Sequence, residues 1–233
     1  METPTRHILG TFENALNTLR NDVLMMASLT ERNLHNAMQG LLSRDSDLSN
    51  LAIADDEEID LLEKQVDQTG IELLLRFQPV ASDLRQVISA MKLSGNLERV
   101  ADQAVNISKR ARKLNQSPEL EDVHYLEPLF NEALGVFKDS LRAFVEGDIE
   151  LAMAVKVRDK KLDEANAEIA HRLTTRMAEL PERIADFLNL LLIARHLERV
   201  GDHSKNIAED AVYAAAAEDI RHPRAQNAVR AAQ

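Results

Sequence analysis

One short stretch of the sequence occurs twice, and this repetition decides the fold. Residues 97–102 read LERVAD, and residues 197–202 read LERVGD. An Asn-Ile pair follows each copy four residues later, at an offset of 100 residues. A second pair of segments, DSDLSNLAIADDEEID at 45–60 and DIELAMAVKVRDKKLD at 148–163, aligns without gaps at an offset of 103. The chain is therefore two copies of one unit of about 100 residues, a length that suits a small helical bundle better than a solenoid repeat.

Each copy is predicted to form three long helices, separated by Pro79, Gly147 and Pro181 among other breaks. In the third helix of each copy, apolar or small residues recur at alternating steps of four and three, which is typical of the buried seam of an antiparallel bundle. The seam residues are Leu93, Leu97, Val100, Ala104, Ile107, Ala111 and Leu114, then Ile193, Leu197, Val200, Ser204, Ile207, Ala211 and Ala214. The predicted helices are 7–43, 46–77 and 81–115, then 121–146, 149–178 and 182–217.

The predicted fold class is therefore all-α, with two tandem three-helix bundles in residues 1–117 and 118–217 and a C-terminal tail in 218–233. Helices of about 30 residues span about 45 Å, so we expect an elongated molecule.

The composition excludes several classes of protein. The formal net charge of −11 opposes nucleic-acid binding, and the absence of cysteine excludes thiolate chemistry, iron–sulfur clusters and cysteine-ligated zinc. No apolar stretch approaches the roughly 20 residues that a transmembrane helix needs. The first residues lack a basic segment followed by an apolar core, so we expect no secretory signal. These features predict a cytoplasmic protein, peripheral to the membrane at most.

Acidic side chains recur at equivalent positions of the two copies. Pairs four residues apart on a helix lie on one face, and like charges at this spacing destabilise a helix by about 0.2–0.5 kcal/mol per pair. Two facing helices that each offer such a pair can present several oxygen ligands to a hard cation. The pairs are Asp56/Asp60, Glu98/Asp102, Asp159/Asp163 and Glu198/Asp202, with Asn106 and Asn206 one turn further along.

In an alternative interpretation, these side chains bind no metal. On a helical wheel Glu98 and Asp102 lie nearly opposite the seam, where solvated polar residues are expected. Arg99 and Arg199 can form ordinary surface ion pairs with Asp102 and Asp202.

His35, His196 and His203 are expected at solvated or capping positions.

The doubled LERV-(A/G)-D motif with its following Asn-Ile, on a duplicated three-helix unit, resembles the PhoU family of phosphate-signalling proteins. The Asp-x-x-(Ile/Leu)-Asp segments at 56–60 and 159–163 and the Gln78-Pro79 dipeptide followed by SDLR at 82–85 are similar to that family as well. The resemblance extends from about residue 8 to residue 217.

The resemblance implies surface metal clusters, one in each bundle. One site would use Asp56, Asp60, Glu98 and Asp102, and the other would use Asp159, Asp163, Glu198 and Asp202, with Asn106 and Asn206 as weaker candidates. Oxygen ligands suit iron, manganese, magnesium or calcium, and zinc is a further candidate, so the identity of the metal stays open.

The resemblance also implies a regulatory role without catalysis. The family couples a phosphate ABC importer to a membrane sensor histidine kinase and represses phosphate-starvation genes when phosphate is plentiful. We expect a homodimer.

Two other functions are open at this point. A carboxylate-bridged di-iron oxidase needs inward-facing Glu-x-x-His motifs on two helices, and the chain has two such strings, Glu121/His124 and Glu168/His171. The first lies in an expected connection, and the second points away from the Asp159/Asp163 face. The other possibility is a metal-free helical scaffold with an acidic surface.

Overall fold

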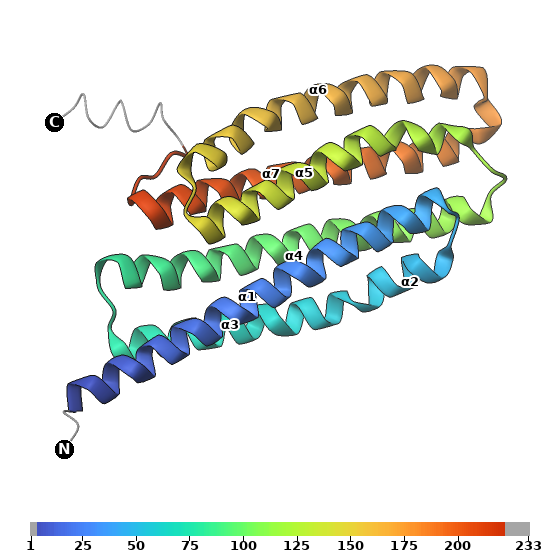
Figure 1. Ribbon diagram of the computed structural model, residues 1–233. Helices are drawn as coiled ribbons and strands as arrows, with labels where there is room; N and C mark the ends of the chain where they lie inside the picture. Colours follow the sequence, from blue (N-terminus) through green and yellow to red (C-terminus); the bar gives the residue numbers. More distant parts are fainter. Residues whose placement is uncertain (1–3, 222–233) are drawn as a thin grey trace.

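The computed structural model describes residues 4–221, with side chains from residue 10 onward, and this part of the chain is helical without any strand (Figure 1). The prediction of an all-α fold with two three-helix bundles is confirmed. Of the predicted tail, residues 222–233 lie outside the described part. The α-helices are α1 (Pro4–Leu42), α2 (Ser46–Ala54), α3 (Asp56–Phe77), α4 (Ala81–Gln116), α5 (Glu127–Glu146), α6 (Ile149–Glu179) and α7 (Ile184–Ala216), and the two 3-10 segments are η1 (Glu121–Leu126) and η2 (Pro181–Arg183).

Helices α4 and α7 form the centre of the molecule, and each contacts the other as well as the helices of its own bundle (Figure 1). They run antiparallel, because contacts that advance along α4 move back along α7. Lys92 pairs with Asp210 at 3.2 Å, and further along α4 a guanidinium nitrogen of Arg110 donates to the side-chain oxygen of Asn189 at 3.3 Å. The two repeats therefore meet through their equivalent third helices.

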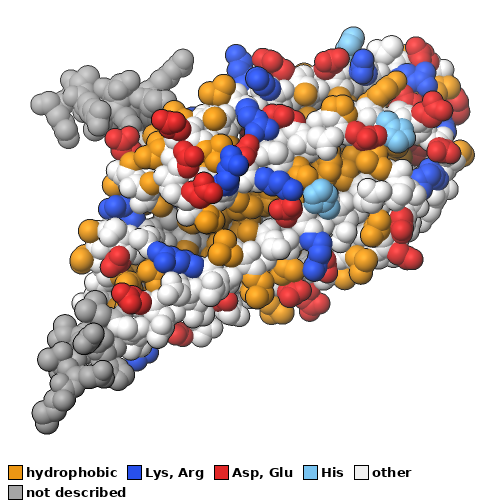
Figure 2. Space-filling model, viewed as in Figure 1, with side chains coloured by type: hydrophobic (Ala, Val, Ile, Leu, Met, Phe, Trp, Pro, Cys, Tyr) orange, Lys and Arg blue, Asp and Glu red, His pale blue; other side chains and the backbone are white. Residues whose placement is uncertain are grey.

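The predicted seam is buried as expected. Thirteen of its fourteen members are buried, and Ala214, in the last turn of α7, is half-buried. The apolar residues of both bundles form one continuous core. On the outside, acidic and basic side chains are interspersed, and hydrophobic side chains gather along the boundary between the two halves (Figure 2).

The repeat also fixes where two helices begin. Asp45 and its equivalent Asp148 are the N-caps of α2 and α6. The Asp45 carboxylate accepts from the backbone N–H groups of Asp47 and Leu48, and the Asp148 carboxylate accepts from that of Leu151. Such caps satisfy N–H groups that have no partner inside the helix.

The single helix predicted for 46–77 is wrong, because the chain breaks at Asp55 into α2 and α3. Residues 55–58 are four consecutive acids, which would repel one another in the middle of a helix. At the start of α3 they face the positive end of the helix dipole instead. The equivalent residues 158–161 read RDKK, and there α6 continues unbroken.

Two other helix starts differ from the prediction. Residues 121–126 form η1 and α5 begins at Glu127, because proline at 128 fits only the first turn of an α-helix. In the same way Pro181–Arg183 is a 3-10 turn ahead of α7.

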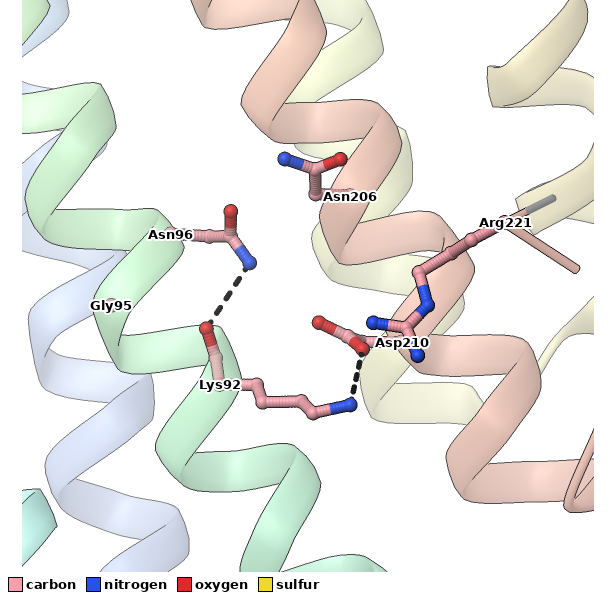
Figure 3. Close-up of a pocket in the computed structure, with 6 residues that line it drawn as sticks. All are labelled: Lys92, Gly95, Asn96, Asn206, Asp210 and Arg221. Atoms are coloured by element: carbon pink, nitrogen blue, oxygen red, sulfur yellow. Dashed lines mark hydrogen bonds and ion pairs between the residues drawn. The ribbon is translucent and has the colours of Figure 1, made fainter. Parts of the chain in front are cut away.

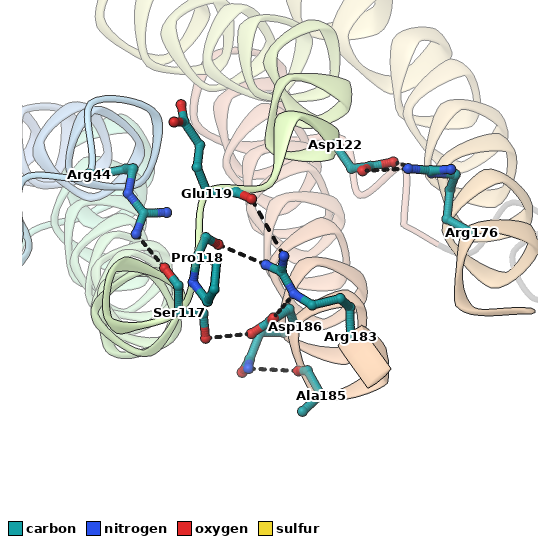
Figure 4. A network of polar contacts seen from close by, with 10 residues as sticks. Arg44, Ser117, Pro118, Glu119, Asp122, Arg176, Arg183, Ala185 and Asp186 are labelled. Carbon is teal, nitrogen blue, oxygen red and sulfur yellow. Dashed lines mark hydrogen bonds and ion pairs between the residues drawn. The ribbon is translucent and has the colours of Figure 1, made fainter. Parts of the chain in front are cut away.

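The connection between the bundles is held by a polar network (Figure 4). The Arg44 guanidinium donates to the backbone carbonyl of Ser117 at 2.5 Å, and the Ser117 hydroxyl donates to Asp186 at 2.8 Å. Arg183 donates to Asp186 at 2.6 Å and to the Pro118 carbonyl at 2.7 Å. These contacts tie the end of α1 and the connecting segment to the start of α7.

In the described residues, no helix has both the length and the apolar content needed to cross a membrane.

Candidate metal centres

The acidic side chains of α3 and α4 gather into a first acidic cluster, defined as Asp56, Asp60, Glu98 and Asp102. Burial raises the pKa of Asp56 to about 6, with further increases from the charges of Asp60 and Asp102. Burial likewise raises the pKa of Glu98 to about 7, assisted by the charges of Asp102 and Asp60 among others. Each helix contributes two carboxylates, and those on α3 act on those on α4.

The second acidic cluster, Asp159, Asp163, Glu198 and Asp202, repeats this arrangement between α6 and α7. Burial raises the pKa of Glu198, and the charges of Asp202 and Asp163 raise it further. Burial also raises the pKa of Asp202, as do Asp159 and Asp163. Within each predicted group of four, the carboxylates of one helix therefore lie near enough to those of the other for their charges to interact.

The prediction of a solvated carboxylate face on the third helix is wrong for Glu98, whose side chain is only 17% exposed. The helical wheel compares a residue with one seam only, whereas α4 contacts α1, α2, α3 and α7. The face opposite the seam is therefore partly covered by α3. The Oε2 atom of Glu98 is buried and accepts no hydrogen bond in the described structure.

Basic side chains already lie against both clusters. In the first, Arg99 Nε lies 3.2 Å from Glu98 Oε2 without hydrogen-bond geometry, and its Nη1 lies 3.6 Å from Asp102. In the second, Lys205 Nζ donates to Asp159 Oδ2 at 2.5 Å. The expected ion pair between Arg99 and Asp102 is thus formed, whereas in the described residues Arg199 and Asp202 form none.

Among the described residues, no three acidic or imidazole side chains converge closely enough, as they stand, to hold a metal ion. The donor chemistry nevertheless fits a hard cation, because each cluster offers only oxygen atoms and Glu98 Oε2 accepts no hydrogen bond. Neighbouring carboxylates also raise the pKa values of Asp56, Glu98, Glu198 and Asp202. Side-chain rotation would be needed to bring the carboxylates into one coordination sphere.

The two weaker candidates lie one turn beyond the clusters. Asn106 is half-buried, and Asn206 is exposed. The amide of Asn206 points into a polar groove of about 330 Å³ between α4 and α7, where Lys92 and Asp210 are paired (Figure 3). The structure thus places Asn206 in this groove.

Sequence reasoning missed two charged residues beside the clusters. Glu63, on α3, has its pKa raised by burial and by the charges of Asp67 and Asp60, and its repeat equivalent is Asn166, so the repetition gave no signal. Lys205 was detectable, because a lysine stands where the first copy has Val105, a buried residue of α4.

The di-iron oxidase hypothesis finds no support, because Glu121, His124, Glu168 and His171 are all exposed and cannot line an inward-facing site. The expectation of solvated histidines holds for His35 but not for His196 and His203, which are half-buried. His196 Nδ1 lies 2.9 Å from the side-chain oxygen of Gln103, across the interface between α4 and α7.

Fold and site together define the class: a helical protein of two tandem three-helix bundles, each with a carboxylate cluster between its second and third helices. The model of the PhoU domain matches residues 23–111 and 126–211, more than half of the chain. The chain therefore belongs to the PhoU family.

Curated relatives and solved structures agree with this assignment. The chain is 34% identical to a phosphate-specific transport system accessory protein PhoU homolog of Pseudomonas putida, over 95% of this chain and 87% of the relative. It is 32% identical to the PhoU accessory protein of Escherichia coli, over 93% and 90%. The crystal structure of PhoU from Pseudomonas aeruginosa superimposes with a TM-score of 0.86 at 32% identity, covering 89% of this chain and 100% of that one. The phosphate transport system regulatory protein PhoU from Streptococcus pneumoniae gives a TM-score of 0.82 at 28% identity, covering 90% and 99%.

Proposed function

We propose that this protein is a metal-binding regulatory adaptor that represses phosphate uptake and phosphate-starvation genes when phosphate is plentiful. One observation carries the proposal: relatives aligned over more than nine-tenths of the chain bear the name of phosphate-specific transport accessory proteins. The adaptor couples a phosphate ABC importer to a membrane sensor histidine kinase, acts from the cytoplasm, and turns over no substrate.

The two acidic clusters are the proposed metal centres. Asp56, Asp60, Glu98 and Asp102 would hold metal in the first bundle, and their equivalents Asp159, Asp163, Glu198 and Asp202 would hold it in the second. Bound metal would supply the positive charge that these carboxylates lack, cross-linking α3 to α4 and α6 to α7. Iron, manganese, magnesium and zinc are the metals to test.

The homodimer belongs to the same proposal. Support comes from exposed apolar side chains where α3 turns into α4: Leu75 and Val80 are each 74% exposed, and Ile71 is 49% exposed. Exposed apolar side chains of this size, when grouped, are typical of contact surfaces between proteins.

Deleting the gene in its natural host tests the regulatory role. We expect phosphate-scavenging genes to be expressed even in phosphate-rich medium, and a plasmid copy of the gene to restore repression. A copy with Glu98, Asp102, Glu198 and Asp202 replaced by alanine should fail to restore it. Tight repression in the deletion strain would contradict the proposal.

A metal-free scaffold is the second candidate, favoured by the contacts that Arg99 and Lys205 already make with the clusters. Elemental analysis of protein purified without chelator separates the two. The proposal predicts bound metal in the natural protein and much less in the four-alanine variant, whereas equal metal content in both would favour the scaffold.

A further inference from the structure

The two clusters differ at one position of the third helix. In the first bundle this position is Val105, which is 5% exposed. In the second it is Lys205, whose ammonium group lies 2.5 Å from Asp159, a residue that is only 7% exposed. A lysine ammonium group in contact with a carboxylate is charged at neutral pH. The second cluster therefore contains a cation in direct contact with one of its ligands.

Asp56, the equivalent of Asp159, has no ion pair or hydrogen bond from a side chain in the described structure. Lys109 is the cation whose charge acts on Asp56, and its influence is the weakest of the four. Lys109 corresponds to Glu209 in the second bundle, and Glu209 is paired with Lys156 at 2.8 Å. The equivalent of Lys156 is Ile53. Among the described residues, α6 and α7 are thus joined by two lysine–carboxylate pairs, whereas α3 and α4 are joined by none.

Arg99 does not neutralise the first cluster as firmly as Lys205 neutralises the second. Its side chain is 61% exposed, and its contact with Glu98 lacks hydrogen-bond geometry, so it can move into solvent at little cost. The Lys205 contact is a short, charge-assisted hydrogen bond to a carboxylate whose side chain is only 11% exposed. Breaking the Lys205 contact therefore costs more free energy than breaking the Arg99 contact.

We propose that Lys205 is a built-in counter-ion that competes with metal for Asp159, so that the two clusters bind metal with unequal affinity and the first cluster fills first. This inference rests on the proposed metal centres. A cation entering the second cluster has to displace the ammonium group or share the carboxylates with it, whereas a cation entering the first cluster meets uncompensated Asp56.

Titration of Mn²⁺ into the full-length, chelator-stripped protein tests this ranking. The electron paramagnetic resonance signal of free Mn²⁺ reports the uptake. We expect two classes of site. The Asp56→Asn/Glu98→Gln variant should lose the tight class, and the Asp159→Asn/Glu198→Gln variant should lose the weak class.

Two single substitutions then test the lysine itself. Lys205→Met should tighten the weak class by about tenfold or more, because a charge in direct contact commonly shifts proton affinity by one to three pKa units. Val105→Lys places a lysine at the equivalent position of the first bundle and should weaken the tight class by a similar factor. The helical circular dichroism of each variant, recorded in chelator, confirms that it is folded. If Lys205→Met fails to fold, Val105→Lys decides alone.

Two classes of equal affinity, or affinities unaffected by these substitutions, would overturn the role of Lys205 and leave the metal centres standing. If the natural protein took up no Mn²⁺, both the centres and their ranking would fail.

Discussion

Glu98 is a mostly buried carboxylate of the first acidic cluster whose pKa is strongly raised. Its carboxylate is mostly buried, lies near Asp102, and has one oxygen without a hydrogen-bond donor. Burial is the main reason that its pKa rises to about 7. Near neutral pH the metal-free protein therefore exists as a mixture of forms with this group protonated and ionised, and a bound cation would favour the ionised form.

The stability of the metal-free protein should consequently depend on pH through Glu98. Because the pKa of the folded state lies above the ordinary value of 4.5, ionising Glu98 opposes folding. Protonated Glu98 contributes to the free energy of unfolding at low pH, and this contribution is lost as the pH rises from about 4.5 to about 7. In chelator, Glu98→Gln should raise the melting temperature at pH 8 and change it much less at pH 5, as measured by circular dichroism.

The control for this measurement is Glu168→Gln on α6. Glu168 has a side chain that is 70% exposed, so this substitution should give the same small change at both pH values. An equal effect of Glu98→Gln at pH 5 and pH 8 would contradict the raised pKa.

At the scale of the helices, backbone conformation determines how the second bundle turns from α5 to α6. Gly147 ends α5 with φ +67°, a left-handed conformation that residues with a side chain adopt at a cost. Gly95 lies in the middle of α4, where an added Cβ would meet only Glu63 at 3.9 Å, an ordinary contact. The same substitution should therefore have opposite effects at the two glycines.

Gly147→Ala should destabilise the protein by about 1 kcal/mol, because left-handed strain outweighs the reduced entropy of the unfolded chain. Gly95→Ala should stabilise it by about 0.5–1 kcal/mol, because alanine is the better helix former. Urea unfolding followed by circular dichroism measures both. A stabilised Gly147→Ala variant would show that the α5–α6 turn does not need its left-handed residue.

The sequence predicted the features that periodicity and the repeat determine. The four-and-three spacing identified the buried seam, and the repeat identified the acidic pairs of the second and third helices. The break at Asp55 depends on four neighbouring charges acting together, and η1 depends on one proline, Pro128; both needed local detail that periodicity does not contain. Periodicity also gives the face on which Glu98 lies without showing that α3 covers it.

At the scale of the whole molecule, the duplication gives two related bundles that meet along α4 and α7. The first acidic cluster is formed by α3 and α4, and the second is formed by α6 and α7. The clusters are therefore carried by separate bundles, while the core between them is shared. Metal bound at the proposed centres would therefore link α3 to α4 and α6 to α7, within each bundle.

Crystals of the full-length protein grown with Mn²⁺ test the central claim, that each bundle gathers metal at its acidic cluster. The account predicts anomalous density peaks between α3 and α4 and between α6 and α7, within bonding distance of the clustered carboxylate oxygens. Density without such peaks, with Arg99 and Lys205 still paired to the carboxylates, would contradict it.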